Sequence, residues 1–240
     1  MAGAATPRAS ARIMTAIAQT GGAVPGTSQA GRYALAIFDF DGTLADSGTW
    51  FLSVSGQLAQ RFGFRAIAPE EVETLRGLTS REFIHYLRVP RWKLPAISRY
   101  IRRLLAAQID QIALFEGMGP LLEALASAGV RLAIVTSNSE ANVRAVLGPA
   151  NAARIEQFEC GVSLFGKAGR FKRVLRRSGL ARADIISIGD ETRDITAARK
   201  VGVTASAVLW GYANGEVIRR LQPDIIFEKP DDIAELLLAK

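Results

Sequence analysis

The sequence contains one cysteine and one histidine in 240 residues, and it has no long apolar run. Cys160 cannot form a disulfide within the chain and offers no zinc-site spacing, so we expect it to be a small packed hydrophobe in a protein of the reducing cytoplasm. The longest apolar stretches, such as 33–38 and 132–135, are far shorter than the roughly 20 residues of a membrane-spanning helix. The composition therefore excludes a disulfide-stapled miniprotein, and we expect no membrane partner.

The charge is unbalanced toward the basic side, with 30 Lys and Arg against 23 Asp and Glu and a formal net charge of +7. Such an excess attracts anions, and phosphorylated small molecules and nucleic acids both carry the required charge. Much of the excess lies in two stretches, 61–103 and 170–177. The second is typical of the solvated face of an amphipathic helix, which disfavours nucleic acid as a partner.

The first 32 residues are rich in Ala, Gly, Ser and Thr and contain no acidic residue. We expect a disordered tail that takes no part in the fold. A transit-like peptide and a start codon placed too far upstream are the other interpretations of this composition. The apolar piece 13–18 is shorter than the roughly 7 residues that the apolar region of a secretory signal needs.

From residue 33 onward, short apolar runs alternate with helical patterns. The runs predict buried strands at 34–38, 130–135, 185–188 and 205–210, with a weak edge strand at 225–227. The helical patterns lie at 118–128, 140–147, 170–178 and 194–201, and glycine follows each of them as a stop signal. This order predicts an α/β protein with a Rossmann-like, doubly wound parallel sheet.

The first two predicted strands are separated by about 90 residues, far more than one crossover connection needs. Helical patterns occupy this interval at 50–62, 70–76, 80–87 and 94–114. The simplest interpretation is an inserted all-helical cap. We therefore expect a catalytic core formed by 33–48 and 115–240, with a cap at 49–114.

The first predicted strand ends in Asp39-Phe40-Asp41-Gly42-Thr43. Two carboxylates two residues apart point the same way on an extended chain, here into the crevice where open α/β sheets bind ligands. Like charges this close are costly unless a cation or a proton lies between them. Gly42 permits a turn and close approach to an anion, while Thr43 and nearby amides can donate hydrogen bonds. A solvated acidic turn is the alternative, which the apolar strand before the motif disfavours.

Three later segments carry polar groups of matching chemistry. Thr136, Ser137 and Asn138 follow the second strand and suit phosphoryl oxygens, although the same residues would also cap a helix. Lys167 in a loop could direct a point charge at phosphate. Asp190 and the nearby Asp194 follow the strand at 185–188 and offer oxygen ligands to a hard cation, helix capping being the alternative for Asp190.

Taken together, these motifs resemble the haloacid dehalogenase-like superfamily in its phosphatase branch, and they look similar to phosphoglycolate-phosphatase-like members with a small helical cap. The likeness runs from about residue 33 to the C-terminus and includes Trp210-Gly211-Tyr212 and Pro223-Asp224. The Asp-x-Asp-Gly-Thr motif is highly specific for the superfamily. None of the motifs is diagnostic of the substrate.

The resemblance implies roles for individual residues. Asp39 would be the nucleophile and form an aspartyl-phosphate, and Asp41 would act as general acid and then as general base. Dehalogenating relatives lack the second aspartate, so Asp41 favours a phosphatase. The expected cofactor is Mg²⁺, held by Asp39, the backbone carbonyl of Asp41 and Asp190, with Asp194 as a ligand or behind the ligands. Phosphate would be bound by Lys167 together with Gly42, Thr43, Thr136, Ser137 and Asn138.

The cap is expected to select the leaving group of a small anionic phosphorylated metabolite. Arg81 lies in a segment that reaches the substrate in similar enzymes, although a solvated arginine is an equal alternative. We expect Trp50 and Phe51 either to line the entrance of the active site or to pack the cap against the core, and large aromatic side chains favour packing. His85 is expected to be structural. Lys93, the sole cap lysine, raises a Schiff-base phosphonate hydrolase as an alternative, which its placement in the sequence disfavours.

Two other functions compete with a phosphatase. A phosphomutase would share the core residues and differ in how the cap shields the intermediate from water. A non-catalytic basic module that binds nucleic acid or a partner would retain the acids without using them. The complete set of core motif residues disfavours this last alternative.

Overall fold

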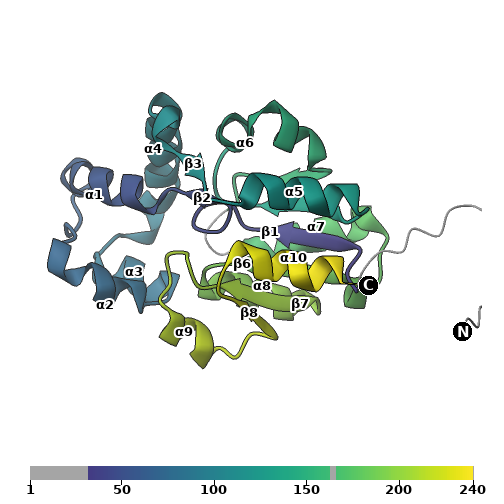
Figure 1. The fold of residues 1–240 in the computed structure, drawn as a ribbon. Coiled ribbons are helices and arrows are strands. Elements are labelled where there is room, and N and C mark those ends of the chain that lie inside the picture. Colours follow the sequence, from purple (N-terminus) through teal and green to yellow (C-terminus); the bar gives the residue numbers. More distant parts are fainter. Residues whose placement is uncertain (1–31, 163–165, 240) are drawn as a thin grey trace, which may run out of the picture.

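The computed structural model describes residues 32–162 and 166–239, and a parallel β-sheet runs through its centre. Helices cover both faces of this sheet, and four more form a separate group at one end (Figure 1). The expected tail at 1–32 lies, apart from its last residue, outside the described residues. Of the described helices, none is long and apolar enough to span a bilayer.

Within the described residues, the main sheet has six strands in the order β5-β4-β1-β6-β7-β8, and all neighbours are parallel. The strands are β1 (Leu35–Phe38), β4 (Arg131–Val135), β5 (Gln157–Glu159), β6 (Ile185–Gly189), β7 (Thr204–Val208) and β8 (Ile225–Phe227). This topology confirms the predicted fold class. The carboxyl ends of β1, β4 and β6 therefore meet at one edge of the sheet.

Alternating side chains of the strands enter two apolar layers, one on each side of the sheet. Ala36 and Phe38 join the layer under α5 (Met118–Ser127), α6 (Glu140–Arg154) and α10 (Pro230–Leu238). Leu35 and Ile37 face the layer under α7 (Lys167–Ser178), α8 (Thr192–Val201) and α9 (Gly215–Arg220). Burial on both faces explains why these strands are continuous apolar runs in the sequence.

One helix of the core ends later than the sequence predicts. The helix predicted at 140–147 bends at Gly148, where φ is +69°, and continues past Pro149 to Arg154. Here the glycine and proline kink the helix, and a second helical segment follows. Gly179 and Gly202, by contrast, end α7 and α8 in the left-handed conformation, as predicted.

The helical insertion consists of α1 (Gly48–Phe62), α2 (Val72–Arg76), α3 (Ser80–Tyr86) and α4 (Leu94–Ala107), with 3₁₀ turns at Pro69–Glu71, Arg91–Lys93 and Ile109–Gln111. The prediction of one helix over 94–114 is wrong at its end. Gln108 leaves the helical conformation, with φ −128° and ψ 30°, and its side-chain oxygen accepts a hydrogen bond from Trp50 Nε1 at 2.7 Å.

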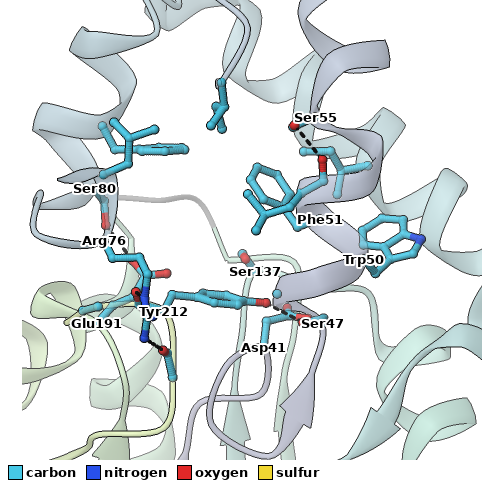
Figure 2. A pocket seen from close by; sticks show the side chains of 18 of the residues that line it. Asp41, Ser47, Trp50, Phe51, Ser55, Arg76, Ser80, Ser137, Glu191 and Tyr212 are labelled. Atoms are coloured by element: carbon cyan, nitrogen blue, oxygen red, sulfur yellow. Dashed lines mark hydrogen bonds between the residues drawn. The ribbon is translucent and has the colours of Figure 1, made fainter. Parts of the chain in front are cut away.

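A short antiparallel pair joins the insertion to the rest of the chain. β2 (Ala45–Asp46) leaves the core, β3 (Ala113–Leu114) returns to it, and the two strands pair with each other. Between the insertion and the loops at the carboxyl end of the sheet lies a cavity of about 640 Å³ (Figure 2). Asp41 and Ser137, two of the residues with predicted roles, line this cavity.

Candidate active site

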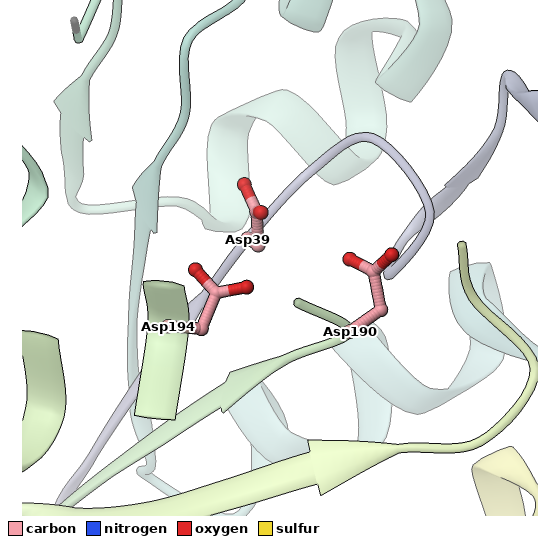
Figure 3. Close-up of side chains that lie close together, drawn as sticks. All are labelled: Asp39, Asp190 and Asp194. Carbon is pink, nitrogen blue, oxygen red and sulfur yellow. The ribbon is translucent and has the colours of Figure 1, made fainter. Parts of the chain in front are cut away.

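Three buried aspartates converge at the carboxyl edge of the sheet (Figure 3). Asp39 follows β1 directly and Asp190 follows the neighbouring β6, so the parallel register brings them to the same edge. Asp194 lies in the first turn of α8, where its Oδ2 accepts a hydrogen bond from Glu191 N at 3.0 Å. Each of the three offers a carboxylate oxygen within 4.8 Å of the others.

Lys167 supplies a positive charge to this cluster from the start of α7. Its Nζ lies 2.7 Å from Asp39 Oδ2 and also forms an ion pair with Asp194. Burial opposes the charge on the ammonium, but the neighbouring Asp194 and Asp39 raise the pKa of Lys167 above its ordinary value. The lysine therefore stays protonated and holds two of the three acids.

The carboxylates are crowded with negative charge. Burial, followed by the charges of Glu191 and Asp39, raises the pKa of Asp190 well above its ordinary value. Burial likewise raises the pKa of Asp194 to about 6, although Lys167 opposes the shift. Buried, clustered carboxylate oxygens are the donor set that a hard divalent cation takes. The residues present fit such a cation.

Asp190 is held by its neighbours from two directions. Thr43 Oγ1 donates a hydrogen bond to Asp190 Oδ1 at 2.9 Å, and Tyr212 N donates to Oδ2 at 2.8 Å. Gly42 passes so close that a Cβ there would lie 2.3 Å from Asp190 Oδ2, and its φ of +79° also favours glycine. The glycine of the Asp-x-Asp-Gly-Thr motif is thus required by both space and backbone conformation.

Asp41 differs from the other three aspartates because it lines the cavity. Ser47 Oγ donates to its Oδ1 at 2.9 Å, and Asn138 Nδ2 lies 3.2 and 3.3 Å from its two oxygens. Tyr212 OH in turn shares a hydrogen bond of 2.5 Å with Ser47 Oγ (Figure 2). Burial, followed by the charge of Asp39, raises the pKa of Asp41 to about 6.

The Thr136-Ser137-Asn138 segment follows β4 at the same edge of the sheet. Thr136 is fully buried, and its Oγ1 accepts a hydrogen bond from Asn138 N at 3.0 Å. Ser137 lines the cavity. The Asn138 side chain is engaged by Asp41, so its observed contact is with the second aspartate of the motif.

Arg193, to which the sequence analysis gave no role, also enters the site and lines the cavity. Its Nη2 lies 2.9 Å from Glu191 Oε1 and 3.9 Å from Asp39 Oδ2, and its buried Nε has no hydrogen-bond partner among the described residues. Burial opposes its charge, but Glu191 and Asp39 raise the pKa of this guanidinium. Its place in the sequence, directly before Asp194 in the first turn of the same helix, could have indicated that Arg193 enters the site.

The cap residues considered from the sequence differ in their position relative to the cavity. Arg81 on α3 is exposed and lies outside the cavity lining. The cap arginines found in the described lining are Arg76 and Arg102. Trp50 is buried and Phe51 half-buried, and both line the cavity. His85 and Lys93 do not belong to the cavity lining. His85 is exposed, and Lys93 Nζ donates a hydrogen bond to the Phe62 carbonyl at 2.6 Å.

Three cap side chains connect the insertion to the core loops. Arg76 Nε and Nη2 donate to the carbonyls of Tyr212 and Gly211 at 3.1 and 3.2 Å. Ser80 Oγ donates to Glu191 Oε2 at 2.7 Å. On the opposite side, Arg102 Nη1 donates to the Ser137 carbonyl at 3.1 Å. We call these contacts the cap–core seam.

Comparison with known proteins places this geometry in a family. The model of the haloacid dehalogenase-like hydrolases matches residues 36–208. A phosphoglycolate phosphatase of Synechococcus elongatus is 31% identical over 200 residues, which cover 83% of this chain and 94% of that protein. Tyrosine-protein kinase PtkA of Mycobacterium tuberculosis is 28% identical over 197 residues, covering 80% of this chain and 67% of that protein.

Solved structures share the fold. A putative phosphoglycolate phosphatase from Lactobacillus plantarum superimposes with a TM-score of 0.72 at 22% identity, covering 85% of this chain and 99% of that one. The match of the family model spans both sequence motifs that supply the buried aspartates. The chain therefore belongs to the haloacid dehalogenase-like hydrolases, within their phosphatase branch.

Proposed function

We propose that this protein is a magnesium-dependent phosphatase that hydrolyses a small-molecule phosphate monoester, of the phosphoglycolate type, through an aspartyl-phosphate on Asp39. The observation that carries the proposal is the meeting of Asp39, Asp190 and Lys167 at one edge of the sheet, next to a cavity lined by Asp41. Its single, half-buried cysteine suits the reducing cytoplasm, where we place the protein.

In the first step, an oxygen of the ionised Asp39 carboxylate attacks phosphorus, and the bond between phosphorus and the ester oxygen breaks. Asp41 donates its proton to the leaving oxygen. In the second step, Asp41 takes a proton from water, whose oxygen attacks phosphorus and releases inorganic phosphate and free Asp39. The support for this division of roles is that Lys167 holds Asp39, whereas Asp41 lines the cavity from which a leaving group departs.

The magnesium ion would be held by carboxylate oxygens of Asp39 and Asp190 and by the backbone carbonyl of Asp41. When bound, it would offset the negative charge of the site and polarise the phosphoryl group. Asp194 forms an ion pair with Lys167, which supports a role behind the ligands, where it keeps the ammonium directed at Asp39.

The phosphoryl oxygens would be bound by positive and hydrogen-bonding groups around Asp39. We assign this role to Lys167, Thr136, Ser137 and the backbone amides of Gly42 and Thr43, and add Arg193 because its guanidinium lies beside Asp39. Asn138, first expected to bind phosphate, is better placed to orient Asp41. We keep the proposed limits of the cap at 49–114 and of the core at 33–48 and 115–240.

The test is a screen of the purified chain with Mg²⁺ against a panel of phosphate metabolites, measuring inorganic phosphate and, by NMR, any isomerised sugar phosphate. Release of phosphate with turnover supports the proposal. Formation of an isomer without phosphate release would identify a phosphomutase instead, and no turnover of any ester would refute the proposed activity.

A further inference from the structure

The cap side of the cavity is mainly apolar, whereas the core contributes mainly polar groups. All four cap helices and the loop between α2 and α3 line it. The apolar side chains facing the hollow include Phe51, Leu52, Leu78, Phe83, Ile84 and Ile101. None of these six is fully buried, and Leu52 is 40% exposed. Apolar side chains around an open chamber indicate a surface that a ligand covers.

The cap brings few cations to this chamber. Among the described residues that line the cavity, its cations are Arg76 and Arg102. Both arginines take part in the cap–core seam. Arg76 donates to two core carbonyls and also pairs with Glu73 of the cap, and Arg102 donates to the Ser137 carbonyl. A substrate carboxylate or second phosphate would find all three nitrogens of Arg76 engaged and Glu73 beside it. On Arg102 the Ser137 carbonyl occupies only Nη1, so this arginine is the cap cation of the described lining that such an anion could still reach.

We infer that the substrate is a phosphate monoester of an apolar alcohol or phenol, whose hydrocarbon part occupies the chamber formed by the cap. The inference rests on the proposed phosphatase function and revises its leaving group, because a glycolate carboxylate would meet mainly apolar side chains on the cap. The ester oxygen would face Asp41, which lines the same cavity, so a group attached to that oxygen extends from Asp41 toward Phe51 and the cap (Figure 2). A volume of about 640 Å³ lies in the range of small-molecule sites.

The first test compares ethyl, butyl and hexyl phosphate with 2-phosphoglycolate, with Mg²⁺ present. Burial of each added methylene is expected to raise kcat/KM about fourfold until the chamber is full. We expect hexyl phosphate to exceed 2-phosphoglycolate by at least tenfold. Hydrolysis of all the esters at equal kcat/KM, or a preference for 2-phosphoglycolate, would overturn the inference and leave the phosphatase function standing.

A binding measurement separates the chamber from the chemistry. Ethyl- and hexylphosphonate carry a carbon–phosphorus bond in place of the ester bond, and their dissociation constants can be measured by calorimetry with Mg²⁺ present. Tighter binding of hexylphosphonate, by at least tenfold, supports the chamber even if no ester is turned over. Equal affinities would overturn it.

Two variants of α1 test the location. Leu52→Asp introduces a charge into the chamber, and Gln60→Asp introduces the same charge at an exposed position of the same helix outside the lining. We expect Leu52→Asp to reduce the advantage of hexyl- over ethylphosphonate by about tenfold, while Gln60→Asp retains it. An unchanged advantage in Leu52→Asp would place the hydrocarbon elsewhere and overturn the assignment.

Discussion

The two sides of the cavity are built in different ways. The core side consists of polar residues that directly follow buried strands, and several contacts hold each side chain, as Thr43 and Tyr212 hold Asp190. The cap side consists mainly of apolar residues on four helices. The cap is held to the core by the hydrogen bonds of the seam and by apolar packing of side chains such as Trp50 and Leu105. In the proposed function, reaction chemistry and choice of ester belong to separate parts of the chain, so variants of each should fail differently.

The largest expected effect is that of Asp39→Asn, which removes the proposed nucleophile. An amide cannot displace the leaving group to form the aspartyl-phosphate, so kcat should fall by roughly 10⁴-fold or more. Phosphate release in a stopped assay measures the loss. The matched control is Asp46→Asn, an exposed aspartate of β2 that lines the same cavity, for which we expect activity within a few-fold of the parent. Near-normal activity of Asp39→Asn would end the covalent mechanism.

Removal of divalent cations with EDTA should reduce turnover by about 10²-fold or more, because three buried carboxylates would then repel the phosphate dianion. Added Mg²⁺ should restore it. Thermal unfolding gives a second readout, since a cation that binds the folded state raises Tm. We expect Mg²⁺ to raise the Tm of the parent and to have no effect on that of Asp190→Asn. Full activity in EDTA contradicts the metal site.

Asp41→Asn should lower kcat by about 10²- to 10⁴-fold, the range for loss of a general acid. Because the expected metal contact of Asp41 is its backbone carbonyl, the Mg²⁺-induced rise in Tm should persist in this variant. The combination of slow turnover and retained Mg²⁺ binding distinguishes the role of Asp41 from that of Asp190. Unchanged turnover would remove the acid–base assignment.

The smallest effect is expected on the cap side. Arg76→Ala removes two hydrogen bonds from the seam, and half-exposed hydrogen bonds of this kind contribute about 0.5–1.5 kcal/mol each. We expect kcat/KM to fall about three- to tenfold and Tm to fall by a few degrees. Arg99→Ala, at an exposed arginine of α4 outside the cavity lining, is the control and should be neutral. Equal kcat/KM for Arg76→Ala and Arg99→Ala would show that the seam does not support catalysis.

The same contrast explains what could be predicted from sequence. The central strands were predictable because burial on both faces makes them apolar, and the aspartates were predictable because they follow those strands. Strand β5 was missed because Gln157 and Glu159 interrupt any apolar run, although both are buried. Contacts such as that of Tyr212 with Ser47 join distant segments and leave no local pattern in the chain.

Cap residues were the least predictable part of the site. The cap helices were located from their periodicity, but that periodicity does not tell which arginine faces the core. Arg76 forms the seam because it ends α2 beside the loop at Gly211 and Tyr212, whereas Arg81 lies on an exposed part of α3. This outcome depends on how short helices pack, which is a tertiary property.

The short pairing of β2 with β3 has a consequence for how such an enzyme can diversify. Ala45 lies opposite Leu114 and Asp46 opposite Ala113, so the chain enters and leaves the insertion at neighbouring points. A segment grafted through adjacent ends can grow, shrink or be exchanged during evolution without moving the strands on either side. New substrate preferences can then arise by replacement of one contiguous stretch, while the ancestral reaction is inherited intact.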